Sequence, residues 1–188
     1  DTDFLEKHAA LRGIRRRNAT SASGTGATVT GQVGAEIKAG LQIKTDDNRF
    51  YETTENAVIS SNGDVTVPVR ALATGASYNI TTATKGSFMA APVGVQSDVV
   101  LNNIIGATDA ESDASLLERL LEIIRRPPAG GNRYDYRIWA LSVDGVDAAY
   151  VYPLRRGLGT VDIAITSNND VPSDETVQRC QTSVSYTH

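Results

Sequence analysis

Residues 109–152 constrain the fold most, because they place a helix start, a helix stop, a second helix start and a strand in direct succession. Three carboxylates lie just ahead of an apolar pattern: Asp109, Glu111 and Asp113. Ser112 or Asp113 can accept a hydrogen bond from the free N–H groups of a helix's first turn, so we predict a helix that begins near Ala114. The carboxylates suit the positive end of that helix.

Leucine and isoleucine recur along this first helix at three- and four-residue spacing, which predicts one buried face. They are Leu116, Leu117, Leu120, Leu121, Ile123 and Ile124. Pro127 and Pro128 lack the N–H groups that would extend the helix, so we expect it to end near Arg126.

A second helix and a strand follow with almost no connecting sequence. Residues 129–131 supply a glycine-bearing turn, and Asn132 is a suitable N-cap for a helix over residues 133–142. Asp144 and Gly145 form a turn signal, and alternation over residues 146–152 then predicts a strand.

The order and spacing of these pieces resemble the baseplate J-like proteins of contractile-tailed bacteriophages. The resemblance is carried by DAESD at 109–113, LLERLL at 116–121, RPPAGGN at 126–132, Asp135-Tyr136, Trp139-Ala140, residues 143–146 and Val151-Tyr152-Pro153. Three earlier segments resemble the β domain of the same family: EIKAG at 36–40, VPVRA at 67–71 and GASYN at 75–79.

The region before this stretch changes to short alternating runs broken by turn residues. We predict strands over residues 28–33, 41–45, 49–53, 57–60, 65–69, 87–90 and 97–101. Asn62-Gly63 is a tight-turn signal, and Pro68 confines its strand to an edge or a bulge, because proline cannot donate to the ladder. The glycine-bearing segments 24–26 and 85–87 are interpreted as turns rather than phosphate loops.

A helix is predicted at the start of the chain, with Phe4, Leu5, His8, Leu11 and Ile14 at helical spacing. A cluster of basic residues follows: Arg12, Arg15, Arg16 and Arg17. We interpret it as the solvated end of that helix, and a phosphate-binding patch is the alternative. Residues 18–26 are polar and are predicted to be a linker. Because the chain begins at Asp1, we expect a fragment or a processed product.

After the central stretch, residues 155–159 are predicted to be a loop leading into a second strand over residues 160–165, and the two strands to form an antiparallel hairpin. Residues 172–175 open a last helix. One apolar face of that helix is formed by Val177, Cys180 and Val184. The expected fold class is therefore α+β: an N-terminal all-β domain, a sandwich or distorted barrel, followed by a small α-α-β-β-α domain. The expected boundaries are 1–23 for the leading helix and linker, 24–105 for the β domain and 106–188 for the α+β domain.

The sequence contains few of the residue arrangements that build common active sites. The histidines, His8 and His188, stand at opposite ends of the chain, which argues against a histidine base or a zinc site. Cys180 is expected to pack on an apolar helix face. The three carboxylates at 109–113 could bind a hard cation, but a helix start explains them better. We therefore expect no catalytic residue, no metal and no cofactor.

The net charge of -4 over 188 residues argues against a dedicated surface for nucleic acid or for an anionic membrane. No apolar run reaches the roughly 20 residues needed to span a bilayer. Nucleic acid and membrane are thus not expected as partners.

Aromatic and basic residues gather in the second half of the chain, as they do at protein interfaces. Tyr134 and Trp139 are expected to be core residues. The candidate interface residues are Tyr152, Arg155, Arg156, Arg133 and Tyr150.

The resemblance implies a structural component of a baseplate wedge that binds copies of itself and other wedge or fibre-attachment proteins. It implies a place in the tail baseplate of a virion that assembles in the bacterial host cytoplasm, with no enzyme activity. The abrupt end of the chain suggests a truncated protein or a prophage remnant. The alternative is a carbohydrate-binding or glycoside-hydrolase module, whose paired carboxylates no sequence pattern could reveal.

Overall fold

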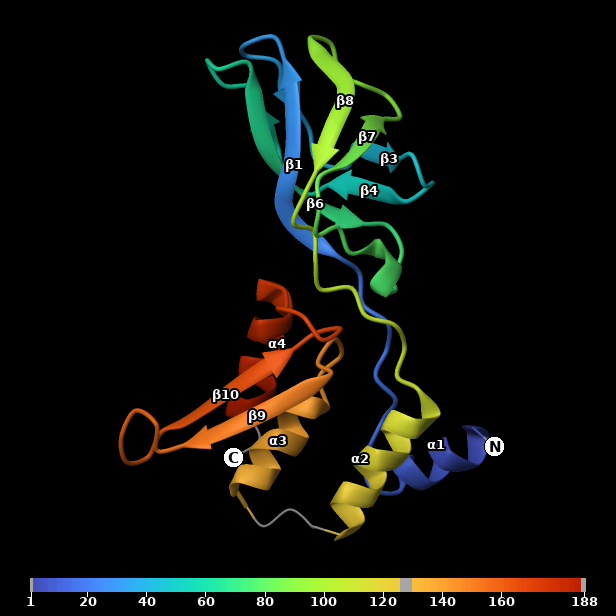
Figure 1. The fold of residues 1–188 in the computed structure, drawn as a ribbon, viewed down its shortest axis with the longest axis vertical. Coiled ribbons are helices and arrows are strands. Elements are labelled where there is room, and N and C mark those ends of the chain that lie inside the picture. The colour runs from blue at the N-terminus through green and yellow to red at the C-terminus, as the bar shows by residue number, and fades with distance from the viewer. Residues whose placement is uncertain (1, 126–129, 187–188) are drawn as a thin grey trace. The chain divides into compact units, whose positions relative to one another are not determined.

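The computed structural model describes residues 2–125 and 130–186 (Figure 1). The chain divides into two compact units. One is formed by Ser21–Ala107, and the other by Asp1–Thr20 together with Thr108–His188. The leading helix therefore belongs to the same unit as the α+β segment. Within the described ranges, no helix is long and apolar enough to cross a membrane.

The unit Ser21–Ala107 is a closed antiparallel barrel, drawn in blue to yellow-green in Figure 1. Its strands, in the order in which they pair, are β1 (Ser23–Gly31), β6 (Asp64–Ala71), β4 (Phe50–Thr53), β3 (Gln42–Thr45), β7 (Thr84–Phe88) and β8 (Val95–Leu101). A small sheet joins β2 (Glu36–Ile37) to β5 (Ala57–Val58), and a 3-10 turn, η1, spans Ala76–Tyr78. Of the two predicted forms, sandwich and distorted barrel, the structure has the barrel.

Alternation along the strands explains the barrel core, because every second side chain points inward. The inward residues are almost completely buried and include Val29, Ile43, Tyr51, Val67, Val69, Val99 and Leu101. The hydroxyl of Tyr51 donates a hydrogen bond to the carbonyl oxygen of Tyr78 at 2.8 Å. The largest polar side chain of this core is thereby satisfied.

Two glycine segments that were predicted to be turns lie within strands instead. A Cβ atom at Gly26 of β1 would lie 1.5 Å from the carbonyl oxygen of Asn102, and one at Gly24 would lie 2.4 Å from that of Asn103. Glycine is needed there because two backbones approach closely. Gly86 likewise lies in β7, against Ile43. The predicted linker over residues 18–26 is also wrong at its end, since β1 begins at Ser23.

Pro68 lies in β6, which has a neighbour on each side and is not an edge strand. The register between β1 and β6 shifts between Gly24 and Ala27, opposite Pro68. The ladder is therefore irregular at the place where proline has no N–H group to donate, which is the bulge alternative of the prediction.

The other unit begins with α1 (Thr2–Ala10), which packs on α2 (Asp113–Arg125). Their shared core consists of Leu5, Ala9, Ile14, Leu116, Leu120 and Ile123. The apolar face predicted for the helix at the start of the chain is partly wrong, because Phe4 is 64% exposed and Leu11 is 80% exposed. The helix ends at Ala10, so Leu11 no longer follows the helical spacing.

Helix α2 begins where the sequence predicts. The Oγ atom of Ser112 accepts a hydrogen bond from the N–H of Ser115 at 3.3 Å, as an N-cap does. Leu116 and Leu120 are buried, whereas Leu117 is 44% exposed, so the buried face is narrower than predicted. The predicted stop at Pro127 and Pro128 lies outside the described residues, and α2 is described as far as Arg125.

Helix α3 (Arg133–Leu141) starts with the predicted cap at Asn132. The Asn132 side chain accepts from the N–H groups of Tyr134 and Asp135, and the Asp135 carboxylate accepts from the N–H of Asn132 at 3.0 Å. This reciprocal pair is a capping box, in which two otherwise free donors are satisfied.

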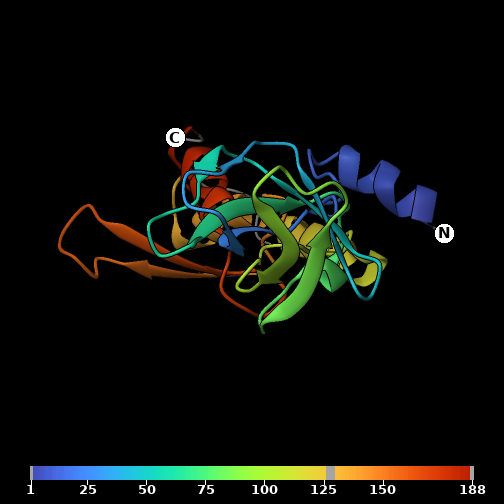
Figure 2. The same ribbon diagram turned by 90° about the horizontal axis from the view of Figure 1, so that it is seen from above.

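The predicted hairpin follows as β9 (Ala148–Pro153) and β10 (Val161–Thr166), and α4 (Asp174–Tyr186) closes the unit. Figure 2 shows β9 and β10, in orange, running side by side to the loop at their tip. A second core forms between α3, α4 and one face of the hairpin; its buried residues include Ala140, Leu141, Val146, Ala149, Cys180 and Val184. The α+β fold class and the α-α-β-β-α order are confirmed.

Candidate protein interface

The β9–β10 hairpin has one covered face and one open face. Val151 pairs with Ile163, and Ala149 pairs with Ile165. Paired residues of an antiparallel ladder point to the same side, and Ala149, Ile163 and Ile165 belong to the core formed with the helices. The intervening residues of β9, including Tyr150, must therefore point to the other side.

Tyr150 and Tyr152 dominate this open face. They are 55% and 45% exposed, respectively. Their partners on β10 are Ala164 and Asp162, which are too small to cover a tyrosine ring. Tyrosine is an amphipathic residue that buries a large apolar area when a partner covers it. The open face of the hairpin thus keeps two such rings available.

Two arginines follow at the tip of the hairpin. The Arg156 guanidinium forms an ion pair with the Asp162 carboxylate at 2.5 Å. The Arg155 guanidinium carbon lies 5.7 Å from the centre of the Tyr152 ring. No carboxylate pairs with Arg155 among the described residues. Arg155 therefore presents a charge beside an exposed aromatic ring.

Arg133 reaches the same region from the first turn of α3. Its guanidinium carbon lies 5.2 Å from the centre of the Tyr134 ring. Arg133, Tyr150 and Tyr152 all line a hollow of about 520 Å³ beside β9, which we call the β9 hollow. The remaining charged side chains of this hollow, Glu122 and Arg137, are paired with each other.

The five residues proposed from sequence thus lie along one hairpin and the adjoining helix start. Arg133, Tyr150 and Tyr152 share the β9 hollow. Tyr152 also lines a groove beside β10 together with Arg155 and Arg156. Tyr152 stands at the border of both depressions.

A buried charge network was missed by sequence reasoning. The Glu111 side chain has no exposed surface and pairs with the guanidinium groups of Arg17 at 3.0 Å and Arg119 at 2.8 Å. It also accepts a hydrogen bond from Ser115 Oγ at 2.9 Å. The sequence assigned Glu111 to a helix start, whereas the structure also makes it the buried centre of a charge network.

Arg17 connects this network to the second core. Its guanidinium donates to the carbonyl oxygens of Val146 and Leu141, which precede the hairpin. Its backbone carbonyl accepts from the N–H of Glu111 at 3.0 Å. The network therefore joins the segment after α1, the start of α2 and the base of the hairpin.

The interpretation of the arginine cluster as a solvated helix end is also wrong in part. Arg16 forms ion pairs with Glu6 at 2.8 Å and Asp113 at 2.6 Å. The hydrogen bond from Arg16, followed by that from Thr2, lowers the pKa of the Asp113 carboxyl. The helix ends at Ala10, so Arg16 and Arg17 lie in non-helical chain and pair with residues distant in the sequence.

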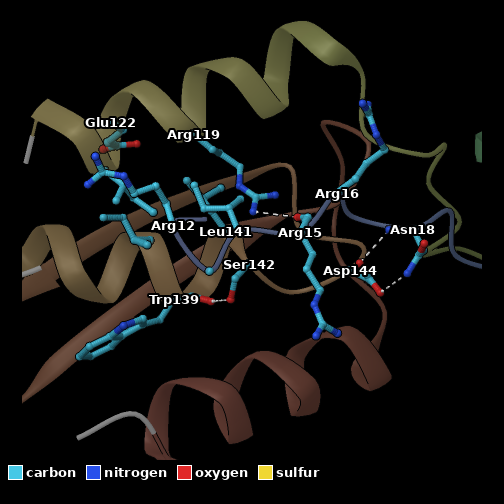
Figure 3. Close-up of a pocket in the computed structure, with 14 residues that line it drawn as sticks. Arg12, Arg15, Arg16, Asn18, Arg119, Glu122, Trp139, Leu141, Ser142 and Asp144 are labelled. Carbon is cyan, nitrogen blue, oxygen red and sulfur yellow. Dashed lines mark hydrogen bonds between the residues drawn. The ribbon is translucent and has the colours of Figure 1, made fainter. Parts of the chain in front are cut away.

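A cleft of about 500 Å³ lies between the segment after α1 and helices α2 and α3 (Figure 3). Its carboxylates are Glu122, which pairs with Arg137, and Asp144, which accepts from the N–H of Asn18 at 2.8 Å. Arginines dominate the rest of its polar lining. A pair of free carboxylates, which a glycoside hydrolase needs, is not found in this cleft.

The described residues also contain no group of three or more histidines, cysteines or acids arranged to hold a metal ion. Cys180 is buried in the second core, and burial raises the pKa of its thiol. This environment favours a packing role over a reactive thiolate.

Comparison with protein families gives two matches in succession along the chain. The barrel domain of baseplate J-like proteins matches residues 26–109, and the baseplate J-like central domain matches residues 128–188. The chain belongs to the baseplate J-like family.

Relatives in this family come from phages and prophages. The chain is 36% identical to baseplate protein gp47 of Escherichia phage Mu over 170 residues, which cover 90% of this chain and 47% of that protein. It is 31% identical to the Mu-like prophage FluMu protein gp47 of Haemophilus influenzae, over 95% of this chain and 51% of that protein. The baseplate J-like chain thus spans about half the length of these relatives.

A solved structure shows the same fold at low sequence identity. A chain in the cryo-EM structure of the anti-feeding prophage baseplate matches with a TM-score of 0.53 and 13% identity. The match covers 97% of this chain and 58% of that chain. The barrel and the α+β unit of the baseplate J-like chain therefore occur together in a solved structure.

Proposed function

We propose that this chain is a structural component of the baseplate wedge of a phage or prophage contractile tail. The observation that carries the proposal is the 36% identity to a baseplate protein of phage Mu over 90% of the chain. The matched solved chain, which belongs to a prophage baseplate, supports the same role.

The hairpin gives this role a physical basis. Tyr150 and Tyr152 are half exposed, and Arg133 and Arg155 lie over aromatic rings without an ion-pair partner among the described residues. Tyrosine and arginine are enriched at the energetic centres of protein interfaces. The β9 hollow and the tip of the hairpin are therefore the surfaces that we assign to neighbouring proteins.

The proposed partners are further copies of this chain and other wedge or fibre-attachment proteins. The proposed location is the tail baseplate, with assembly in the cytoplasm of the bacterial host. No enzyme activity is part of the proposal, since the conspicuous buried carboxylate, that of Glu111, is paired with the guanidinium groups of Arg17 and Arg119.

The test is the location of the chain in assembled tails. An epitope-tagged chain is expressed in its bacterial host during induction, and purified tails are labelled with a gold-conjugated antibody. Labelling at the baseplate end of the tail is the expected result. Tails that carry no label while the tagged chain accumulates in the soluble fraction would contradict the proposal.

A further inference from the structure

The outer edge of β10 has no strand beside it among the described residues, because β9 is the one strand with which it pairs. The carbonyl groups of Thr160 and Thr166 accept hydrogen bonds from the β9 side. Backbone groups alternate in direction along an antiparallel strand, so a second set faces away from β9. These outward groups belong to Val161, Ile163 and Ile165.

A groove of about 460 Å³ runs beside this edge, between β10 and α4, and we call it the β10 groove. Its apolar lining includes Val161, Ile163, Ile165, Val177, Cys180 and Val184. Val177 is 44% exposed, although it belongs to the predicted apolar face of α4. The groove is therefore an apolar surface that adjoins unpaired backbone groups.

Nothing in β10 protects the edge from pairing. Soluble proteins usually block an open edge with lysine, proline, a bulge or an inward charge. β10 contains neither lysine nor proline, and its regular register with β9 shows no bulge. Its one charge, Asp162, is paired with Arg156. Such an edge is suited to accept another strand.

Charge is distributed unequally along the hairpin. The tip carries Arg155 and Arg156. The opposite end, where β10 leads into α4, carries Asp170, Asp174 and Glu175, which are exposed and form no ion pair among the described residues. The β10 edge thus has a basic end and an acidic end.

We propose that β10 pairs antiparallel with β10 of a second copy of this chain around a two-fold axis. A parallel arrangement would place like charges together, whereas the antiparallel one places the basic tip of each copy beside the acidic end of the other. The interface is then self-complementary, as two-fold symmetry requires. It also joins the two hairpins into one continuous sheet.

The inference deepens the proposed function by naming the surface through which copies meet, and it rests on that function for the setting in which they meet. The edge supplies the main-chain hydrogen bonds, and the apolar β10 groove supplies the buried area. Tyr152 borders this groove, whereas Tyr150 lines the β9 hollow and is left free for other baseplate proteins.

Sedimentation velocity of the purified chain, from roughly 10 to 200 µM at low salt, tests the pairing. Chains of 20.0 kDa are expected to form a dimer of twice that mass. Arg155→Glu and Glu175→Lys, each alone, should raise the dimer dissociation constant about tenfold. Each variant places like charges together at both ends of the two-fold interface, where the basic tip of one copy meets the acidic end of the other. The double variant R155E/E175K should restore dimerisation, since it reverses both charges.

Lys85→Glu, an exposed residue of the barrel, is the matched control, because it changes the net charge by the same amount as R155E. It should leave dimerisation unchanged. A monomer at every concentration, or a dimer that is insensitive to both single reversals, would overturn the pairing. Either result leaves the location in tails untouched, so failure here is distinguishable from failure of the proposed function.

Discussion

Arg17 and Glu111 form an ion pair at 3.0 Å, although the Arg17 side chain is only 10% exposed and the Glu111 side chain is fully buried. The residues are 94 positions apart, and the whole barrel unit lies between them in the sequence. Two buried charges are stable only when they neutralise each other and their remaining hydrogen-bonding groups are satisfied. The pair therefore holds the chain entering the barrel beside the chain leaving it.

Glu111→Gln should destabilise the protein strongly. The change keeps the shape of the side chain but leaves Arg17 and Arg119 without a neutralising carboxylate in a buried site, which costs about 3–5 kcal/mol. Urea unfolding followed by circular dichroism measures the loss. Glu118→Gln, an exposed residue of the same helix, is the control and should change stability by less than about 0.5 kcal/mol. Equal stability of the two variants would refute a structural role for the network.

Gly26→Ala should destabilise the barrel. A Cβ atom at this position would lie 1.5 Å from the carbonyl oxygen of Asn102, so β1 and the end of β8 would have to separate. Overpacking of this kind costs about 1–3 kcal/mol or more. Thr25→Ala, the exposed neighbour in β1, should be nearly neutral. Comparing the denaturation midpoints of the two variants measures the cost of the added Cβ atom. A neutral Gly26→Ala would show that the backbones of β1 and of the segment after β8 are not in contact.

The stability of the barrel should fall at high pH because of Tyr51. Burial raises the pKa of Tyr51 from 10.0 to about 12. A pKa that is raised in the folded state contributes stability that is fully present below the unfolded value and is lost as pH rises through the folded value. The window is therefore pH 10 to about 12. The loss is at most about 3 kcal/mol, from two units of pKa.

Unfolding at about pH 8 and about pH 11.5 measures this effect. Tyr51→Phe is the control, because it cannot ionise although it loses the hydrogen bond to Tyr78. The variant should lose less stability than the wild-type protein between the two pH values. Equal losses of stability in the variant and the wild-type protein would show that ionisation of Tyr51 is not coupled to unfolding.

Replacing both exposed tyrosines of the hairpin should weaken assembly without unfolding the chain. Tyr150→Ala/Tyr152→Ala removes the rings that we assign to a neighbouring protein, and each such ring contributes about 2 kcal/mol or more at an interface centre. Recovery of the tagged chain in purified tails should fall at least tenfold. Val93→Ala, at a fully exposed position of the barrel, is the control. Normal recovery of the tyrosine variant in tails would show that these two rings of the hairpin are not needed for assembly.

The sequence predicted those parts of the fold that depend on local signals. The cap at Asn132 and the turn at Asp144-Gly145 act within a few residues, so the second helix and the hairpin could be predicted from the sequence. Gly26 shows the limit, since glycine marks both turns and close contacts between strands. A single sequence does not say which of the two applies.

The role of Glu111 could not be predicted for a related reason. Its position in an acidic run before a helix is typical of a solvated cap, and its actual partner, Arg17, lies beyond the barrel in the sequence. Only the closed fold brings the two together. The candidate interface residues could be proposed from residue type, but the hollow and groove that they line depend on side-chain packing between distant elements.

Electron cryomicroscopy of the assembled tail, at a resolution that shows side chains, tests the central claim most directly. We expect this chain in the baseplate, with Tyr150 and Tyr152 covered by a neighbouring protein chain. A baseplate that lacks the chain, or one in which both tyrosines face solvent in every copy, would contradict the claim that the hairpin serves assembly.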